Sequence, residues 1–147
     1  MVDNIDDEFL ERNVKGLMMD LVARWNGEMD HAQSRTEFSM IRPSDMRVFA
    51  HMRGRPTLLS EIHGALDMSR QAAQQSVQRL IAHGVVCVDS APNSRRDKIV
   101  SVTEKGQALR RFAAGQLRKI ERRCEECVGA DGLNNLRQLL FLLNTRS

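Results

Sequence analysis

Glutamine and arginine side chains occupy one face of a predicted helix near the middle of the chain. Residues 69–84, SRQAAQQSVQRLIAHG, begin with a serine that can cap a helix and end with a glycine that often terminates one. Apolar residues recur at helical spacing on one side, and the other side carries Arg70, Gln71, Gln74, Gln75 and Gln78. No acidic residue occurs between positions 68 and 88. Because Gln can pair with adenine and Arg with guanine in the major groove, this face predicts contact with DNA.

A basic hairpin is predicted directly after this helix. Two β-branched runs, residues 85–90 and 99–102, flank turn-forming residues at 91–94. Arg95, Arg96 and Lys98 lie between the turn and the second run. A shorter helix is predicted upstream, over residues 57–66, by the spacing of Leu58, Leu59, Ile62 and Leu66. The order helix, turn, helix and hairpin is that of a winged helix-turn-helix.

These residues resemble the MarR-type regulators, the family of multiple-antibiotic-resistance repressors. The resemblance is carried by SRQAAQQSVQRLIAHG, by the wing NSRRDKIVSVTEKG and by the helix that follows. It covers the chain from roughly the end of the first helix to the C-terminus. It implies a homodimer that reads a pseudo-palindromic operator in double-stranded DNA. The family usually has aspartate where this wing has Ser94, and Asp97 is the candidate to replace that carboxylate.

The resemblance also implies which side chains contact DNA: Ser69, Arg70, Gln71, Gln74, Gln75, Gln78, Arg95, Arg96 and Lys98. The first five are expected to face the major groove, with Gln78 at its margin. Arg96 is expected in the minor groove, because a narrow A-tract groove attracts a guanidinium group. Arg95 and Lys98 are expected at phosphates.

Helices are predicted on both sides of the winged helix. One long amphipathic helix is expected over residues 5–29, and Pro43 can open another that carries Met46, Val48, Phe49 and Met52. A long helix is expected from Thr103 to Gly129, followed by a last one capped by Asp131. The last helix has apolar residues beyond one face, which indicates an interface. The predicted fold is mainly α, with a β-hairpin wing and N- and C-terminal dimerisation helices. Residues 1–147 form one domain, with a winged helix at about 38–103 and dimerisation helices at 1–35 and 104–147.

Charge is distributed unevenly along the chain. The net charge is +3, yet the first 30 residues hold eight acids and three bases, while residues 103–147 hold nine bases and five acids. Positive charge is therefore scarce in the predicted first helix and concentrated in the predicted DNA-binding helix and wing and in the helix after them. This asymmetry is typical of proteins that bind nucleic acids.

Compartment and chemistry follow from composition. The acidic start MVDNIDDEFL does not resemble a signal peptide, and no apolar run reaches transmembrane length. Three cysteines, an odd number, favour a reducing compartment, so the prediction is a cytoplasmic protein without membrane contact. The four histidines are scattered, and neither a nucleophile motif nor a phosphate loop is present. The prediction is therefore not an enzyme, with no cofactor and no metal.

The cysteines leave an alternative open. Cys124 and Cys127 fall on the apolar stripe of their predicted helix, and Cys87 lies in a β-branched run, so all three are expected to be buried and unreactive. Zinc usually takes four ligands, and no second Cys or His pair lies near in sequence. The alternatives are a thiol-based redox sensor that uses Cys124 and Cys127, or a winged helix used for protein contact.

A small-molecule effector is implied by the resemblance. Relatives often bind small aromatic or phenolic compounds between the dimer helices and the winged helix. The implied function is that of a repressor, which such an effector releases from DNA. The corresponding site in this chain would include Trp25, Met46, Arg47 and His51. Methionine suits such adaptable pockets, although plain core filling explains any single methionine equally well.

Overall fold

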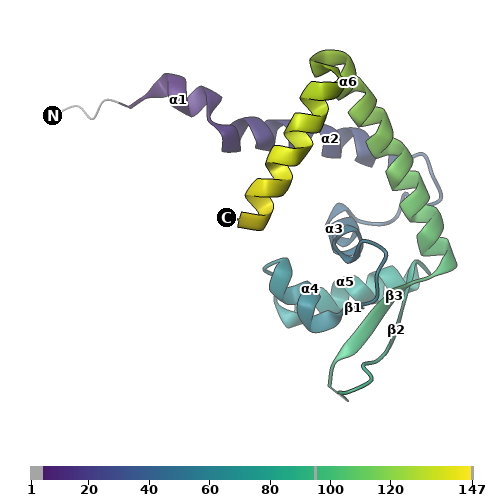
Figure 1. Ribbon diagram of the computed structural model, residues 1–147. Coiled ribbons are helices and arrows are strands. Elements are labelled where there is room, and N and C mark those ends of the chain that lie inside the picture. Colours follow the sequence, from purple (N-terminus) through teal and green to yellow (C-terminus); the bar gives the residue numbers. More distant parts are fainter. Residues whose placement is uncertain (1–4, 95, 147) are drawn as a thin grey trace.

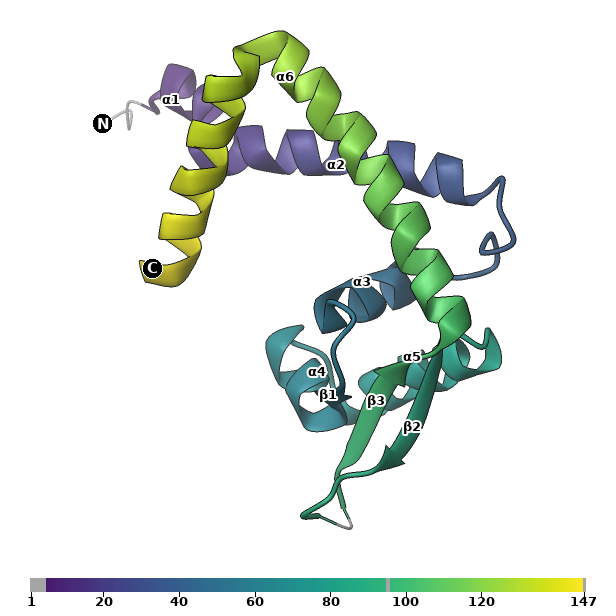
Figure 2. The same cartoon turned by 45° about the vertical axis from the view of Figure 1, so that its right-hand side comes forward.

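A small antiparallel sheet and short helices form the lower part of the molecule, and the longest helices lie above it (Figures 1 and 2). The computed structural model describes residues 5–94 and 96–146. Its elements, in chain order, are α1 (Asp7–Arg12), α2 (Val14–Gln33), α3 (Pro43–Met52), β1 (Thr57–Leu58), α4 (Leu59–Ala65), α5 (Arg70–Ala82), β2 (Val86–Ser90), β3 (Lys98–Val102) and α6 (Glu104–Arg146). The predicted mainly helical fold with a β-hairpin wing is confirmed.

The winged helix has one aliphatic core. Helices α4 and α5 pack on the sheet, whose strand order is β1-β3-β2, and α3 packs on α5. Val48, Ile62, Leu80 and Val100 are completely buried, one from each of α3, α4, α5 and β3. Leu109 adds the start of α6 to the same core. Burying a side chain of this size contributes about 1.5–3 kcal/mol, so the core fixes how α5 and the wing lie relative to each other.

Strand β1 was not predicted. The expected helix over residues 57–66 begins two residues late, because Thr57 and Leu58 pair with Val100 and Ile99 of β3. Two residues are too few to show a strand periodicity, and Leu58 also fits the helical pattern. The pairing places α4 directly beside the wing.

The single long helix predicted over residues 5–29 is wrong. Asn13 has an extended backbone conformation and caps a new helix, because its side chain accepts a hydrogen bond of 2.8 Å from the Gly16 amide. Asn13 also donates to the Leu10 carbonyl at 2.7 Å and so satisfies the end of α1. Apolar periodicity continues across this break, which hid it in the sequence. Helix α2 then runs on to Gln33, four residues beyond the predicted end at residue 29.

Gln33 ties the end of α2 to the loop that leads into α3. Its buried side-chain amide donates to the carbonyls of Phe38 at 3.0 Å and Ile41 at 3.1 Å. An amide that satisfies two buried carbonyls stabilises an irregular loop that lacks regular backbone pairing. The start of α3 is therefore positioned by α2 as well as by the core.

Helix α6 is bent sharply at Gly129, where the predicted break lies. Gly129 has a φ of 80° and a ψ of 164°, outside the helical region, and a residue with a Cβ rarely adopts this conformation. The first half rises from the wing, crosses α2 and ends at the bend, from which the second half returns downward (Figure 2). An ion pair between Arg123 and Glu28 joins α6 to α2. No helix among the described residues is both long and apolar enough to span a membrane.

Candidate nucleic-acid interface

Helix α5 presents its predicted polar face to solvent. The Ser69 hydroxyl accepts a hydrogen bond of 3.0 Å from the Ala72 amide, so serine caps the helix as the sequence indicates. Ala73, Ser76, Val77 and Leu80 are buried on the inner side. The outer side exposes all the residues expected in the major groove and its margin: Ser69, Arg70, Gln71, Gln74, Gln75 and Gln78. The structure thus brings these side chains onto one accessible surface.

The wing is a two-stranded hairpin with a serine-organised tip. Strands β2 and β3 pair in register from Val86 with Val102 to Ser90 with Lys98. The Ser94 hydroxyl accepts hydrogen bonds of 3.2 Å from the amides of Arg96 and Asp97. Serine therefore supplies an acceptor where the family usually has a carboxylate. Arg96 and Lys98 are exposed, and Arg95 lies outside the described residues.

Asp97 connects the wing to α4. Its carboxylate accepts from the Ser60 hydroxyl at 2.7 Å, from the Ser60 amide at 3.4 Å and from the Lys98 amide at 2.9 Å. The hydrogen bond from the Ser60 hydroxyl is the largest cause that holds the pKa of Asp97 below its ordinary value, and the nearby Arg70 acts in the same direction. Among the described residues, Asp97 thus connects the tip of the wing to the start of α4.

A shallow recess of about 420 Å³ lies where α4, α5 and the wing meet. Its lining combines residues from all three elements: Leu59, Ser60, His63, Arg70, Gln74, Ser94, Arg96 and Asp97. Arg70 and Gln74 of α5 therefore lie close to Arg96 of the wing, although more than 20 residues separate them in sequence. A recess with two guanidinium groups beside exposed amides suits the phosphate backbone of a nucleic acid.

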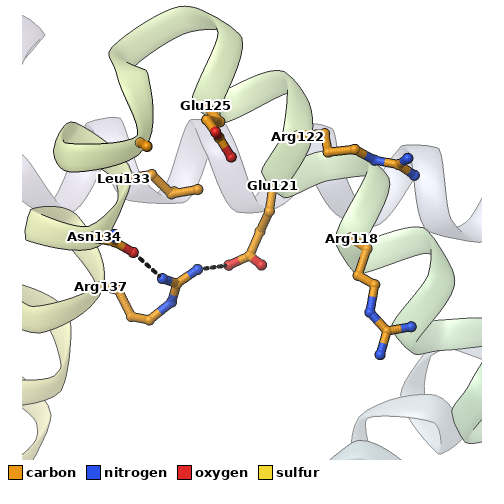
Figure 3. Close-up of a pocket in the computed structure, with 8 residues that line it drawn as sticks. Arg118, Glu121, Arg122, Glu125, Leu133, Asn134 and Arg137 are labelled. Carbon is orange, nitrogen blue, oxygen red and sulfur yellow. Dashed lines mark hydrogen bonds and ion pairs between the residues drawn. The ribbon is translucent and has the colours of Figure 1, made fainter.

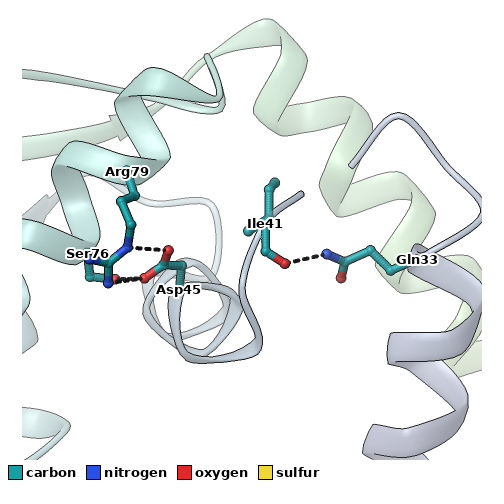
Figure 4. A network of polar contacts seen from close by, with 5 residues as sticks. All are labelled: Gln33, Ile41, Asp45, Ser76 and Arg79. Atoms are coloured by element: carbon teal, nitrogen blue, oxygen red, sulfur yellow. Dashed lines mark hydrogen bonds and ion pairs between the residues drawn. The ribbon is translucent and has the colours of Figure 1, made fainter. Parts of the chain in front are cut away.

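Arg79 lies on α5 but does not belong to this surface, because it faces α3. Its guanidinium binds the carboxylate of Asp45 through Nε and Nη2, each at 2.8 Å (Figure 4). The Ser76 hydroxyl donates to the same carboxylate at 2.6 Å. This cluster was not predicted from the sequence. The available signal was that Asp45 and Ser76 occupy positions on the apolar stripes of their helices.

The residues of the expected effector site lie on two helices. Trp25 is half-buried on α2, while Met46, Arg47 and His51 lie on α3, where Met46 packs against the core and Arg47 is exposed. The recess beside the wing includes none of them. This site stays a prediction.

A second recess, of about 460 Å³, lies inside the bend of α6 (Figure 3). Arg137 from the returning half reaches Glu121 on the rising half at 2.7 Å and Asn134 at 2.7 Å. Leu133 and Ala130 add apolar surface, and Arg118 and Arg122 add positive charge. None of the expected effector residues contributes to it. The contact between Arg137 and Glu121 in this recess instead joins the two halves of α6.

The prediction that the cysteines are buried is wrong. Cys87 and Cys127 are exposed, and Cys124 is partly buried. On the apolar stripe of α6, Leu109 and Ile120 are buried, while Leu117 is 50% exposed. Periodicity identified an apolar side of α6, but within one chain no element covers most of it. Among the described residues, no group of three or more His, Cys, Asp or Glu side chains could hold a metal ion.

Apolar side chains are exposed along the helices at both ends of the chain. On α1 and α2 these include Phe9 at 63%, Val14 at 67% and Met19 at 60%. On the returning half of α6 they include Leu139 at 58% and Phe141 at 67%. A folded chain rarely leaves so much contiguous apolar surface in water, and such surfaces usually mark protein interfaces.

Known structures share this architecture. No family model and no curated relative matches the sequence. A MarR protein from Peptoclostridium difficile is 13% identical, with a TM-score of 0.75 over 99% of this chain and 90% of that one. The apo form of wild-type MarR from E. coli is 18% identical, with a TM-score of 0.71 over 90% of this chain and 96% of that one. BpsR from Bordetella bronchiseptica, whose DNA binding is described as regulated by 6-hydroxynicotinic acid, is 18% identical. Its TM-score is 0.66 over 90% of this chain and 99% of that one.

The likeness extends over the whole chain, since it includes the winged helix and the long helices at both ends. At 13–18% identity it is a likeness of fold, and it agrees with the resemblance that the recognition helix and wing carry in the sequence. The fold of this chain is that of the MarR-type winged helix-turn-helix transcriptional regulators.

Proposed function

We propose that the chain is a sequence-specific DNA-binding transcriptional regulator and not an enzyme. The observation that carries this proposal is the exposed, acid-free face of α5 beside a basic wing. Arg70 and four glutamines present hydrogen-bonding groups there without a carboxylate that would repel phosphates. The recess shared by Arg70, Gln74 and Arg96 supports it, because the helix and the wing can contact one duplex together. The solved neighbours named as MarR proteins support the same function.

The regulator acts as a homodimer in this proposal. The exposed apolar residues of α1, α2 and α6 form the interface with a second copy, and the acidic N-terminal helices complement the basic α6. Two-fold symmetry requires a nearly palindromic operator with half-sites about one helical turn, roughly 10 bp, apart. The regulator is a cytoplasmic repressor, released from its operator by a small aromatic or phenolic effector that contacts Trp25, Met46, Arg47 and His51.

Selection of duplexes from a random-sequence pool, followed by footprinting, tests the function. The wild-type protein is expected to enrich one motif with dyad symmetry. Gln75→Ala should lose about 1–3 kcal/mol on the selected duplex and little on random DNA, because a base contact carries the specificity. Arg95→Ala should weaken both and reduce the salt dependence by about one phosphate contact. Failure to enrich any motif would contradict the proposal.

Exposure of the thiols favours a second candidate function, redox sensing through Cys124 and Cys127. Cys127 is exposed on α6 and lies three residues from the partly buried Cys124, so an oxidant can reach it. Mild peroxide should then release the selected duplex from the wild-type protein but not from Cys127→Ser. Cys87→Ser, which alters an exposed thiol outside α6, is the control. Unchanged DNA binding after peroxide treatment would remove this candidate.

A further inference from the structure

The Asp45 carboxylate fixes the recognition helix at two points. Asp45 lies in the first turn of α3 and is completely buried. Its two contacts on α5, Ser76 and Arg79, are three residues apart and therefore project from the same side of that helix. Both carboxylate oxygens are used, because Arg79 binds one through Nε and the other through Nη2. This arrangement restrains both rotation of α5 about its axis and its translation along α3.

The ion pair is held in its charged form despite burial. Burial raises the pKa of Asp45, but hydrogen bonds from Arg79 and Ser76, together with the charges of Arg79 and Arg42, outweigh it and lower the pKa below the ordinary value. A buried ion pair usually contributes no more net stability than well-packed apolar side chains of similar volume. Stability alone therefore does not account for a buried carboxylate in an otherwise aliphatic core.

The apolar contacts between α3 and α5 do not fix the rotation of α5 about its axis. Val48, Phe49 and Met52 of α3 share one buried cluster with the small or aliphatic side chains of Ala73, Val77 and Leu80 of α5. Apolar burial is not directional, so a modest rotation of α5 would retain much of it. Hydrogen bonds to Asp45 are directional and weaken steeply when their geometry changes.

A small rotation would matter on the opposite face of α5. With side chains, an α-helix has a radius of about 5–6 Å, so a rotation of roughly 20° displaces side-chain ends by about 2 Å. A hydrogen bond to a base edge tolerates only a few tenths of an ångström. Gln75 and Gln78, which directly precede Ser76 and Arg79 in the sequence, would be displaced with them.

We propose that Asp45 is a positioning residue for sequence readout. Together with Ser76 and Arg79 it sets the rotation of α5, and so determines which glutamines meet base edges, without touching DNA itself. The inference rests on the proposed function and adds to it a specificity-determining residue outside the DNA-contacting surface.

The decisive variant replaces the whole cluster by apolar residues: Asp45→Leu, Ser76→Ala and Arg79→Met in the full-length chain. One acid and one base are lost, so the net charge and the general attraction to phosphates stay the same. The probes are the duplex that the wild-type protein selects from a random pool and a scrambled duplex of the same composition. Glu121→Gln with Arg137→Met, which removes an exposed ion pair far from α5, is the matched control.

Three experimental results are expected for the triple variant. The melting temperature of the triple variant should equal or exceed that of the wild type, since apolar replacement of a buried ion pair is neutral or stabilising. Affinity for the scrambled duplex should be unchanged, and affinity for the selected duplex should fall about tenfold or more, as on losing one good base contact. A second selection with the triple variant should enrich an altered or degenerate motif.

Other outcomes overturn the inference. A folded triple variant that binds the selected duplex as tightly as the wild type would show that the apolar core alone orients α5. If the triple variant does not fold, Arg79→Lys decides, because lysine keeps the charge but cannot bind both carboxylate oxygens in parallel. Wild-type affinity of a folded Arg79→Lys protein would also overturn it. A wild-type protein that enriches no sequence would refute the proposed function and this inference together, which distinguishes that result from the other two.

Discussion

The hydroxyl of Ser60 in α4 donates a hydrogen bond of 2.7 Å to the carboxylate of Asp97 in the wing. This contact spans 37 residues in sequence and joins the helix-turn-helix to the hairpin at the edge of the shared recess. Because β3 also pairs with β1, directly before α4, the wing is attached at two neighbouring places. The hairpin that carries Arg96 therefore has a defined direction relative to α5.

Ser60→Ala is expected to loosen the wing without unfolding the protein. The variant removes one exposed hydrogen bond, so the melting temperature should change little, while the wing samples more orientations. Affinity for the selected duplex should fall several-fold, and hydrogen exchange of the wing amides should accelerate. Ser44→Ala, at an exposed serine on α3, is the control. Unchanged affinity together with unchanged exchange would show that the contact does not hold the wing.

Acid should weaken the contact between α3 and α5 through Asp45. The pKa of Asp45 in the folded protein lies below its ordinary value of 3.8. Its contribution to stability is therefore complete above that value and is lost as the pH falls through the lower, folded pKa. Thermal unfolding between about pH 5 and pH 2 should show a steeper loss of stability for the wild type than for Asp45→Asn, which cannot ionise. Asp67→Asn controls for the loss of one exposed charge. Parallel pH profiles of the wild type and Asp45→Asn would contradict this prediction.

Gly106 is expected to tolerate no larger residue. A Cβ at this buried position in the first turn of α6 would collide with the Val85 carbonyl and the Val102 side chain, where α6 meets the wing. Gly106→Ala should therefore cost about 1–3 kcal/mol of the free energy of unfolding. Gly115→Ala, in the same helix but with open space around it, should instead stabilise by about 0.5–1 kcal/mol. Denaturant titrations at one protein concentration measure both, and equal effects of the two variants would refute the steric argument.

The end helices should determine the oligomeric state. Phe9 is 63% exposed on α1, and burying an aspartate in its place against a second copy would be costly. Phe9→Asp is therefore expected to shift the protein from dimer to monomer in sedimentation experiments. Met40→Asp introduces the same charge at a residue that is 76% exposed but lies in the loop before α3, so it should leave the dimer intact. A wild-type monomer at micromolar concentration, or equal behaviour of both variants, would contradict the proposed interface.

Much of the winged helix could be predicted because its signals are local. Ser69 as a cap, the acid-free face of α5, the turn residues of the wing and the break at Gly129 each act within a few residues, and the structure has them where the sequence indicates. The recess between Arg70 and Arg96 depends on how α4, α5 and the wing pack together. In the sequence, only the order of these elements indicated that they would be neighbours.

Most of the errors have tertiary causes. Asn13 is the exception, because its side chain breaks the helix through local hydrogen bonds that a regular apolar pattern conceals. Strand β1 forms because β3 offers it a partner. Cys124 and Cys127 lie on an apolar stripe, but a stripe does not reveal whether the same chain covers it. Arg79 has the charge of a DNA ligand, and only the three-dimensional structure shows that a buried aspartate binds it.

The single tryptophan offers a direct test of the effector site. Trp25 is the only tryptophan of the chain and is half-buried on α2, so its fluorescence reports binding at the proposed site without labels. Small aromatic acids, including the 6-hydroxynicotinic acid described for the Bordetella protein, are expected to change this fluorescence and to release the selected duplex. By linkage, the effector must bind the DNA-free form more tightly than the DNA-bound form by the factor by which it weakens DNA binding. Arg47→Ala should weaken the response, because an exposed guanidinium on α3 is the expected partner of a carboxylate. Arg53→Ala, at the exposed arginine that caps the end of the same helix, should respond like the wild type. If aromatic acids and phenols leave both the fluorescence and the operator affinity unchanged, the chain binds DNA without such an effector.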